Sequence, residues 1–537
     1  MNLKEPYYIF VVGGVCSSLG KGQITASIAY LLKSMNKNVF IKKLDPYLNV
    51  DPGTMNPSQH GEVFVTHDGI ETDQDLGTYE RLTGILSNIN SNITSGKIYQ
   101  NLIFSERQGQ FHGNTIQTIP HITNEIINFI EKDNKKYDFV VIEIGGTTGD
   151  IEMEPFLEAL RQLIIKKKFK ICVCQLVWTP LLTSVNQIKT KPAQNAIKML
   201  NMAGIQPNIL FIRSSLKLKV EDKKKLALFG NINEDYVFEI LDLDNIFLLP
   251  EHLLIQNFLS MILKFFNIEE QISLNINKLK VFNQKCHEIL LQKDKKNIFL
   301  ICKYTDIEDS YISLIYAIKF AAIKENINYK ITFINAKKLF QDNYQEVLKN
   351  AEGIIVPGGF GENGFEGKIL ACKYARENNI PFLGICYGLH TCLVEFARNV
   401  LNLKDANTEE IAPSTKNKVI HLVKGKKTSD NLGGTLRLGN YQCILKKNTL
   451  TFDIYKKNLI FERHRHRYEV NEKFLDKFEK FGFIVSGVCS QSKLVEIMEL
   501  KTHPFYIGCQ FHPEFNQTFD NPAPLFLKFI QKVAKIS

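Results

Sequence analysis

A cysteine with the surroundings of a catalytic nucleophile lies in the second half of this 537-residue chain. Cys386 stands in the run PFLGICYGLH, where an apolar strand pattern ends and a helical pattern begins. Gly384 and Gly388, two residues to either side, allow the sharp strand-to-helix turn that exposes a nucleophile. A helix N-terminus behind the sulfur favours the thiolate form. The spacing therefore predicts nucleophilic chemistry at Cys386.

The run QFHPE near the C-terminus supplies partners for that cysteine. His512 could act as a base and Glu514 could orient it, which completes a nucleophilic triad. The N–H of Tyr387 and the glycine turn PGGFG at 357–361 could form an oxyanion hole. A buried structural cysteine beside an unrelated His-Pro turn is the alternative. The order of elbow, glycine turn and HPE favours the catalytic interpretation.

A glycine-rich turn near the N-terminus has the composition of a phosphate-binding loop. The apolar run 8–12 ends in two glycines, and the cluster Gly20-Lys21-Gly22 precedes a helical pattern. Backbone N–H groups, a helix N-terminus and an ammonium group together favour a bound phosphate. The Walker pattern is matched imperfectly, because five residues separate Gly14 from Gly20 where four are expected, and Gly22 replaces the usual Ser or Thr. Taken alone, the turn does not decide between a nucleotide site and an ordinary strand–helix connection.

Acidic side chains in the first half could hold Mg²⁺. Glu143 ends the apolar run FVVIE before a double glycine, and the carboxyl ends of parallel strands face the ligand crevice. Its alternative role is to cap the next turn. Asp75 could be a second oxygen ligand, although three neighbours are equally eligible by composition: Asp68, Glu71 and Asp73. Lys43, at a strand end, could reach phosphates or simply be solvated.

Two lysines in the run KTKPAQ stand beside a helix that Pro192 begins. Lys189 and Lys191 oppose the helix macrodipole there, and a bound anion would relieve that conflict. An exposed surface pair remains the alternative interpretation.

The elements that must position these residues alternate between strand and helix patterns. Candidate strands in the first half are 8–12, 39–43, 139–144, 170–177 and 208–212, with helices at 24–34 and 192–202. This alternation predicts a doubly wound parallel sheet with helices on both faces. Residues 45–113 look like a long functional loop rich in Asp, Glu, His, Gly and Asn.

A polar, lysine-rich stretch with helical apolar spacing separates this half from a second α/β series. That series predicts strands at 298–303, 329–335, 353–357 and 381–385 and helices at 310–324 and 367–378, with shorter β runs over 418–499. We therefore expect domains at 1–268 and 297–537, joined by a linker helix at 269–296.

Composition indicates an ordinary globular protein, with 44% apolar and 23% charged residues. The net charge of +10 is spread along the chain, so the short lysine runs suggest solvated helix faces and not a nucleic-acid surface. Eleven cysteines without metal-ligand spacing favour a reducing compartment. Without a signal pattern or a bilayer-length apolar run, a cytoplasmic protein without membrane contact is expected.

The motifs together resemble the CTP synthase family. The second half is similar to class I glutamine amidotransferase domains through PGGFG, GICxG and FHPE. The first half is similar to the synthase domain through segments that include SSLGKG, KLDPYLNVDPGTMNPSQHGEVFV, ETDQDLGTYER, IPHIT, EIGGTTGDIE and KTKPAQ. LGGTLRLG and ERHRHRYEVN extend the match, which runs from residue 17 to beyond residue 514.

The resemblance implies a carbon–nitrogen ligase that aminates UTP to CTP, the last step of CTP synthesis, with ATP and glutamine. ATP would phosphorylate the 4-oxygen of the uracil ring, and ammonia from the second domain would displace the phosphate. It implies a P-loop-like fold of the dethiobiotin-synthetase kind for the first domain. It further implies Mg²⁺, activation by GTP, feedback inhibition by CTP and a homotetramer.

The resemblance also implies site residues. ATP would contact Ser18, Leu19, Gly20, Lys21, Gly22, Gln23, Lys43 and Asp75, with adenine near Leu241, Asp242 and Leu243, and Mg²⁺ would contact Asp75 and Glu143. UTP and CTP would contact Ser17, Gln117, Asp150, Ile151, Glu152, Lys189, Thr190, Lys191, Pro192, Ala193, Gln194 and Lys225. Glutamine would contact Gly359, Tyr387, Gly388, Leu389, His390, Glu410 and Arg467. His60 would belong to the ammonia passage, and Arg437 would be linked to GTP.

The chain departs from the family pattern in two places. Leu389-His390 replaces the usual Met-Gln after the nucleophile, so an imidazole stands where the family has an amide. The segment 106–113 is less basic than its family counterpart and lacks the tyrosine. We expect the first change to affect glutamine affinity and the second to affect nucleotide feedback.

Two other functions share parts of this pattern. A different ATP- and glutamine-dependent amidase, which aminates a carboxylate, would have a similar P-loop and glutaminase but no use for KTKPAQ. An ATP-binding assembly protein with an inactive glutaminase would have no need for Cys386, His512 and Glu514.

Overall fold

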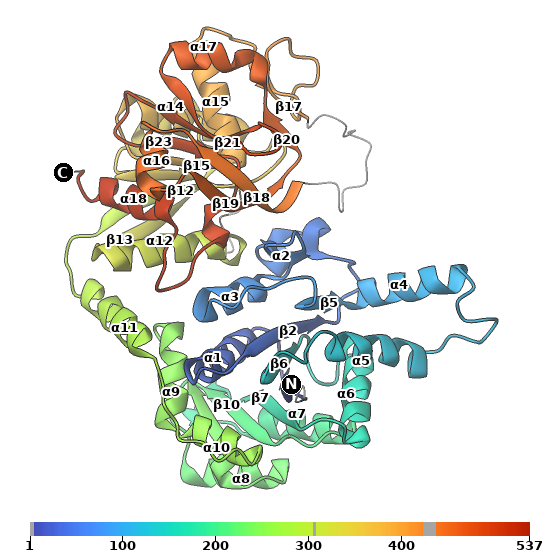
Figure 1. Ribbon diagram of the computed structural model, residues 1–537. Coiled ribbons are helices and arrows are strands. Elements are labelled where there is room, and N and C mark those ends of the chain that lie inside the picture. The colour runs from blue at the N-terminus through green and yellow to red at the C-terminus, as the bar shows by residue number, and fades with distance from the viewer. Residues whose placement is uncertain (1–4, 304, 306–307, 423–436, 537) are drawn as a thin grey trace. The chain divides into compact units, whose positions relative to one another are not determined.

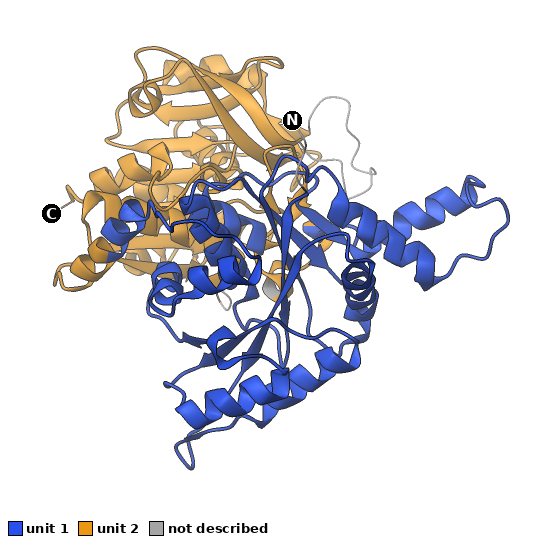
Figure 2. Ribbon diagram, turned by 60° about the horizontal axis from the view of Figure 1, so that its bottom comes forward, with its two compact units in different colours: residues 1–52, 75–283 blue, residues 53–74, 284–537 orange. Residues whose placement is uncertain are grey.

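The computed structural model describes residues 5–303, 305, 308–422 and 437–536, which form two compact units. The first unit comprises residues 1–52 and 75–283, and the second comprises residues 53–74 and 284–537 (Figure 2). A short piece of the N-terminal half, residues 53–74, therefore packs as part of the second unit. The domain boundaries expected from the sequence stay predictions.

The first unit is built on a seven-stranded sheet in which every neighbouring pair is parallel. The strand order is β11-β10-β7-β1-β6-β2-β5. The bounds are β1 Tyr7–Gly13, β2 Val39–Asp45, β5 Asn92–Thr94, β6 Phe139–Ile144, β7 Ile171–Trp178, β10 Ile209–Ser214 and β11 Val237–Leu241. The prediction of a doubly wound parallel sheet is confirmed, because helices cover both of its faces (Figure 1).

Alternate strand residues divide the core of this unit between the two faces. Phe10 and Val12 pack with α5 (Thr123–Glu131) and α6 (Glu154–Lys166), while α7 (Lys191–Met202) and α8 (Val220–Gly230) cover Val177 and Ile212. The opposite face holds α1 (Lys21–Ser34), α9 (Leu249–Ile255) and α10 (Phe258–Phe265), where Phe258 packs on Phe211. The strands are buried on both sides, as their continuous apolar runs predict.

The segment 45–113 is more ordered than the expected long loop, and that expectation was wrong over two helices. α3 (Gln74–Thr83) and α4 (Ser95–Arg107) lie there, with the short α2 (Pro57–His60) and the hairpin of β3 (Phe64–Val65) and β4 (Glu71–Thr72). In α3 the polar residues Glu80 and Arg81 are buried beside the apolar ones, which hides a helical hydrophobic pattern. In α4 few apolar residues are buried, so the helical hydrophobic pattern is as weak there as in α3.

The predicted linker contains a helix, α11 (Asn277–Leu290). Leu279, Phe282 and Ile289 are buried and Cys286 is half-buried, as their helical spacing predicts, but Leu290 at the end of the helix is exposed, contrary to that spacing.

The second unit is built on a nine-stranded sheet in the order β13-β12-β14-β15-β23-β22-β21-β18-β19. The first five strands in this order pair in parallel, and the remaining four are antiparallel. The bounds are β12 Lys296–Cys302, β13 Tyr329–Asn335, β14 Gly353–Val356, β15 Phe382–Ile385, β18 Arg437–Leu445, β19 Leu459–His466, β21 Phe483–Cys489, β22 Val495–Leu500 and β23 Tyr506–Cys509. The predicted second α/β series is confirmed.

Two helical layers enclose this sheet. α12 (Ile312–Glu325), α16 (Leu450–Tyr455) and α18 (Pro524–Val533) pack on one face, around Leu300 and Phe529. α14 (Phe365–Glu377) and α15 (Tyr387–Asn399) pack on the other, with α13 (Tyr344–Leu348) and α17 (Leu475–Lys480). The smaller sheets comprise β16 (Asn407–Thr408), β17 (Lys418–Leu422) and β20 (Tyr468–Val470), and in the first unit β8 (Leu181–Leu182) and β9 (Gln187–Ile188).

Candidate functional site

The nucleophile turn lies between the end of β15 and the start of α15. Cys386 has φ 52° and ψ −100°, a conformation that L-residues rarely adopt. A Cβ on Gly384 would lie 2.7 Å from the carbonyl oxygen of Gly388, and a Cβ on Gly388 would lie 2.1 Å from that of Val356. Both positions therefore exclude any side chain. The turn has the geometry of the predicted nucleophile elbow.

His512 and Glu514, which the sequence predicts as base and orienter, lie in contact with each other. Nδ1 of His512 lies 2.8 Å from Oε1 of Glu514, and both side chains are buried. The glycine turn also approaches this ring, since a Cβ on Gly358 would lie 2.8 Å from Cε1 of His512. Nε2 of His512 is buried, and Cys386 is an electrostatic neighbour of the ring. The elbow, the base and the glycine turn thus occupy one site.

The electrostatic environment of His512 favours its protonated form. Burial alone would lower the pKa of the imidazole, but the Glu514 carboxylate and the neighbouring Cys386 raise that pKa to about 10. A protonated imidazole places positive charge and a transferable proton beside Cys386. This arrangement suits the predicted pairing of a cysteine nucleophile with a histidine.

The sulfur of Cys386 also contacts two groups that sequence reasoning missed. Nε2 of Gln510 lies 3.8 Å from Sγ, and Sγ lies 3.8 Å from the carbonyl oxygen of Arg465. His390, predicted to contact glutamine, is buried and has Nε2 3.0 Å from Oε1 of Gln510. Gln510 stands two residues before His512 in the run QFHPE, and this position is the only sequence feature that points to its place at the site.

The predicted glutamine-holding residues gather around the glycine turn. Oε1 of Glu410 accepts a hydrogen bond of 2.8 Å from the N–H of Gly361, and the Tyr387 hydroxyl donates to the carbonyl of Gly361. Burial raises the pKa of Glu410, while the Gly361 N–H, Lys303 and Arg467 oppose that rise. Glu410 and Arg467 are thus electrostatic neighbours with opposite charges, which suit the amino and carboxylate groups of an amino acid.

A buried lysine near this turn was also missed. Lys368 of α14 is 2% exposed, and its Nζ lies 4.9 Å from the ring centre of Tyr387. A Cβ on Gly359 would lie 3.3 Å from this Nζ. Burial lowers the pKa of Lys368 to about 8. The sequence signal is weak, because a lysine within a helix is usually solvated.

In the first unit, the predicted phosphate loop joins β1 to α1. Lys21 is the first residue of α1, and its Nζ donates to the carbonyl of Gly146 at 2.8 Å. The Lys21 side chain folds over Gly13, where a Cβ would lie 2.8 Å from Cδ. Gly20 has φ 100° and no side chain caps α1 there. An uncapped helix N-terminus with a lysine across it suits a phosphate.

The two predicted metal carboxylates lie beside this loop. A Cβ on Gly22 would lie 2.4 Å from Oδ1 of Asp75. Lys43 donates to Oδ2 of Asp75, and the buried Tyr79 donates to Oε2 of Glu143. Lys21, Lys43, Asp75 and Glu143 are therefore brought together, while Tyr79 was missed because a helix tyrosine carries no specific signal.

The carboxylate pair fits a divalent cation. Burial and the nearby Asp75 raise the pKa of Glu143 to about 7, although Lys43 and Lys21 counteract this. Burial is the larger cause of this rise and Asp75 adds to it, so a cation bound between the two carboxylates would favour the ionised form of Glu143. Two carboxylates with substrate phosphates are a usual Mg²⁺ ligand set. No cluster of three or more metal-ligating side chains lies within the ranges that the structure describes.

The predicted adenine residues are tied to the phosphate loop by an arginine. Nη2 of Arg213 lies 3.0 Å from Oδ1 of Asp242, and its Nη1 donates to the carbonyl of Leu19 at 2.9 Å. Arg213 stands near the carboxyl end of β10, so its place at a predicted strand end was its only sequence signal. The structure thus brings the loop at 241–243 to the phosphate loop.

The predicted UTP and CTP residues lie on exposed turns and helix ends. Asp150, Ile151 and Glu152 are exposed before α6, and Lys191 begins α7. A Cβ on Gly149 would lie 2.8 Å from Sδ of Met199, so the 149–152 turn and α7 are neighbours. Further predicted residues are exposed or half-buried: Ser17, Gln117, Lys189 and Lys225. Thr190 and Gln194 are buried, with a hydrogen bond of 2.9 Å between their side chains.

His60 and Arg437 both belong to the second unit. His60 is exposed on α2. Arg437 begins β18, and its guanidinium lies 2.6 Å from Glu496, 3.5 Å from Glu469 and 4.2 Å from the ring centre of Tyr441. Most of the preceding LGGTLRLG motif lies outside the described residues.

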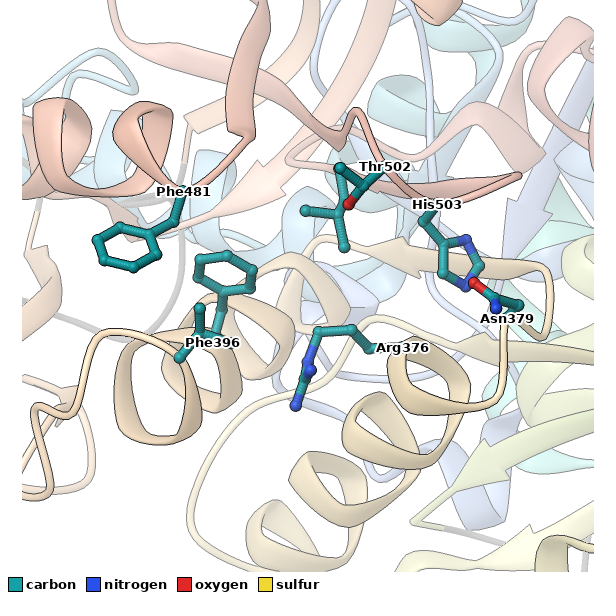
Figure 3. A pocket seen from close by; sticks show the side chains of 8 residues that line it. Arg376, Asn379, Phe396, Phe481, Thr502 and His503 are labelled. Carbon is teal, nitrogen blue, oxygen red and sulfur yellow. The ribbon is translucent and has the colours of Figure 1, made fainter.

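A pocket of about 220 Å³ opens elsewhere in the second unit. Figure 3 shows its eight lining residues, which include Arg376, Phe396, Phe481 and His503. None of the site residues predicted from the sequence is among the eight. Within the described residues no single helix is long and apolar enough to cross a membrane, and the bent pair 246–255 and 258–265 meets that test by length and composition only.

Comparisons with known proteins find matches for both halves of the chain. The family model for the CTP synthase N-terminus matches residues 7–268, and the model for class-I glutamine amidotransferase matches residues 306–532. A solved structure titled as the glutaminase domain of Trypanosoma brucei CTPS with bound acivicin is 32% identical, with a TM-score of 0.43, over 45% of this chain and 95% of that chain.

Curated relatives extend the match over nearly the whole chain. A CTP synthase from Hydrogenobaculum sp. is 46% identical over 99% of this chain and 98% of the relative. CTP synthases from Bacillus subtilis and Pelagibacter ubique are 45% and 48% identical, over 97% and 98% of this chain and 98% and 99% of each relative. With both family models matched and curated relatives aligned over nearly its whole length, this chain belongs to the CTP synthase family of glutamine-dependent ligases, which convert UTP to CTP.

Proposed function

We propose that this chain carries out its amination of UTP at two sites built from the residues described above. The observation that carries the proposal is the meeting of Lys21, Lys43, Asp75 and Glu143 around a glycine-rich helix N-terminus. That arrangement serves phosphoryl transfer from ATP, which a glutaminase alone does not require.

The first site activates the uracil ring. The γ-phosphoryl group of ATP is transferred to the 4-oxygen of UTP, ADP leaves, and ammonia then displaces phosphate from C4. Lys21, at the start of α1, holds phosphate oxygens together with the backbone N–H groups of the loop. Asp75 and Glu143 would hold Mg²⁺, which when bound neutralises charge on the phosphates. Tyr79 orients Glu143 through the phenolic hydrogen bond.

The second site releases ammonia from glutamine. The Cys386 thiolate attacks the side-chain amide, and His512 gives its proton to the leaving ammonia. Glu514 holds the imidazole through Nδ1. Water then hydrolyses the thioester. Glu410 and Arg467 hold the amino and carboxylate groups of glutamine, and the N–H of Tyr387 with the glycine turn stabilises the oxyanion.

Nucleotide recognition and regulation extend the proposal. UTP, and CTP as its feedback inhibitor, bind at the exposed residues of the 149–152 turn and the start of α7, with Ser17, Gln117 and Lys225. Adenine lies near Leu241, Asp242 and Leu243, which Arg213 holds. GTP activates through a site linked to Arg437, His60 contributes to the ammonia passage, and the enzyme works as a cytoplasmic homotetramer.

One incubation tests the synthase half directly. The full chain with UTP, ATP, Mg²⁺ and ammonia should produce the absorbance change from uracil to cytosine, while omission of ATP or Mg²⁺ should abolish it. An amidase that acts on a carboxylate would give no such change. Absence of CTP with every component present would refute the proposal.

A further inference from the structure

A buried chain of side chains leads from His390 to the nucleophile within the second unit. Nε2 of His390 lies 3.0 Å from Oε1 of Gln510, and Nε2 of Gln510 lies 3.8 Å from Sγ of Cys386. The three residues are 3%, 0% and 4% exposed, so bulk water cannot replace these contacts. Hydrogen bonds in such surroundings are stronger than in water and more sensitive to the loss of one partner.

The direction of these hydrogen bonds follows from the chemistry of the groups. The amide oxygen of Gln510 can only accept, so Nε2 of His390 must carry the hydrogen. The ring is neutral at physiological pH, since burial lowers the pKa of His390 to about 4 against the opposing bond to Gln510. A neutral ring with hydrogen on Nε2 has none on Nδ1, and Nδ1 is buried without a partner among the described residues. The amide of Gln510 then presents its N–H groups to the sulfur.

We propose that His390 is a positioning residue that fixes the Gln510 amide with its N–H toward Cys386 Sγ, so that the amide stabilises the thiolate. The proposal rests on the proposed role of Cys386 as the nucleophile. It assigns His390 an action through Gln510, in place of the direct glutamine contact that the sequence resemblance implies.

Rotation of the Gln510 amide is the freedom that His390 removes. The backbone of Gln510 is held, because its N–H donates to the carbonyl of Glu496 at 2.8 Å. If the side-chain amide were reversed, its oxygen would face the sulfur and repel a thiolate. The carbonyl of Arg465 already lies 3.8 Å from Sγ and accepts from the thiol form. The sulfur thus lies between one donor and one acceptor, and His390 secures the donor.

Alkylation of Cys386 measures this effect without turnover. The full-length protein is treated with iodoacetamide in the absence of glutamine, and the labelled peptides are quantified by mass spectrometry. Cys16, which is exposed in the first unit, serves as an internal reference for the reagent. We expect His390→Leu to slow labelling of Cys386 about fivefold, the fold-change that a hydrogen bond of ordinary strength represents, with Cys16 unchanged.

Matched variants distinguish the action of His390 through Gln510, called the relay below, from a general disturbance of α15. His390→Gln restores a donor to Gln510 and should return the rate to near the original value. Cys392→Ala truncates another buried side chain of α15, whose sulfur donates to the carbonyl of Leu389, and should not slow labelling of Cys386. Gln510→Leu should slow labelling as His390→Leu does, and the double variant should be no slower than Gln510→Leu alone. If His390→Leu fails to fold, Gln510→Leu and His390→Asn carry the same test.

Steady-state glutamine hydrolysis distinguishes the relay from substrate contact. The relay predicts that His390→Leu lowers kcat and leaves the KM for glutamine nearly unchanged. A raised KM with unchanged labelling of Cys386 would overturn the proposal in favour of direct contact. If Cys386 of the unsubstituted protein is labelled no faster than Cys16, the assignment of Cys386 as the nucleophile fails. If Cys386 is labelled faster than Cys16 but equally fast in His390→Leu and in the unsubstituted protein, only the positioning role of His390 is overturned.

Discussion

Gly22 and Asp75 lie so close together that a side chain at position 22 would displace the Asp75 carboxylate, because a Cβ there would lie 2.4 Å from Oδ1 of Asp75. This contact explains the departure from the Walker pattern, in which Ser or Thr at this position supplies a hydroxyl to Mg²⁺. In the proposed site the carboxylate of Asp75, from another helix, would take the place of that hydroxyl.

Substitution of Gly22 should therefore damage the synthase site. Gly22→Ser should lower ATP-dependent CTP formation from ammonia by roughly a hundredfold, since displacement of a positioned group by about 1 Å can cost that much. Gly22→Ala should lose as much, because the collision and not the hydroxyl is the cause. Basal glutamine hydrolysis should be unchanged in both. Activity of Gly22→Ser at the original level would contradict this account of the metal site.

Glu143→Gln should stabilise the first unit while it abolishes CTP formation. The pKa of Glu143 is raised from its ordinary value to about 7 chiefly by burial, so the folded unit binds a proton that the unfolded chain has lost. Stability therefore falls as pH rises from about 4.5 to about 7, and this loss persists above that range. At about pH 8 without Mg²⁺ the variant should therefore be more stable than the unsubstituted protein.

Trp178 makes this measurement specific. It is the only tryptophan of the chain and lies in β7 of the first unit, so its fluorescence during urea unfolding reports on that unit. Mg²⁺ with ATP should stabilise the unsubstituted protein and have little effect on Glu143→Gln. Equal stability of the two proteins at high pH without Mg²⁺ would show that ionisation of the buried Glu143 does not destabilise the folded unit.

Glu514→Gln should move the alkaline limit of glutamine hydrolysis to lower pH. Burial opposes protonation of His512, but Glu514 and Cys386 raise its pKa to about 10, so the imidazolium persists until the pH reaches that value. Removal of the Glu514 charge lowers this pKa, and the activity should decline about one pH unit earlier or more. Hydrolysis rates measured from neutral to strongly alkaline pH test this. An unmoved alkaline limit would assign the raised pKa to another cause.

Glu71→Gln should weaken glutamine hydrolysis through a structural link in the second unit. Oε1 of Glu71, in β4, lies 2.6 Å from Nε of Arg465, whose carbonyl oxygen contacts Cys386 Sγ. Loss of the ion pair should lower glutamine-dependent CTP formation several-fold, about the effect of one charge-assisted hydrogen bond, and spare the ammonia-dependent reaction. Equal loss of both reactions would show that Glu71 acts elsewhere.

The sequence patterns predicted those features that are determined by residues close together along the chain. The elbow follows from Gly384 and Gly388, and the parallel sheet follows from apolar runs separated by helical patterns. The partners of these features come from distant segments, and spacing carries no information about them. Gln510 reaches Cys386, and Arg213 reaches Leu19, only after the chain has folded.

Neighbouring lysines in β2 illustrate the same limit. Strand alternation places Lys42 and Lys43 on opposite faces of the sheet. Lys43 meets Asp75, whereas Lys42 is buried and donates to the carbonyls of Phe129, Ile130 and Lys132 at the end of α5. One lysine serves the site and the other serves the fold. The two are adjacent residues of the same type in one strand, so the sequence does not distinguish their roles and the structure does.

The central claim is that one chain holds a glutaminase at Cys386 and a separate synthase site that accepts ammonia. The most direct test measures CTP formation by Cys386→Ala with UTP, ATP and Mg²⁺, once with glutamine and once with ammonia. The substitution removes the sulfur and leaves the first unit intact, so glutamine-dependent formation should disappear while ammonia-dependent formation continues at the original rate. Loss of both activities, or survival of both, would contradict the two-site account.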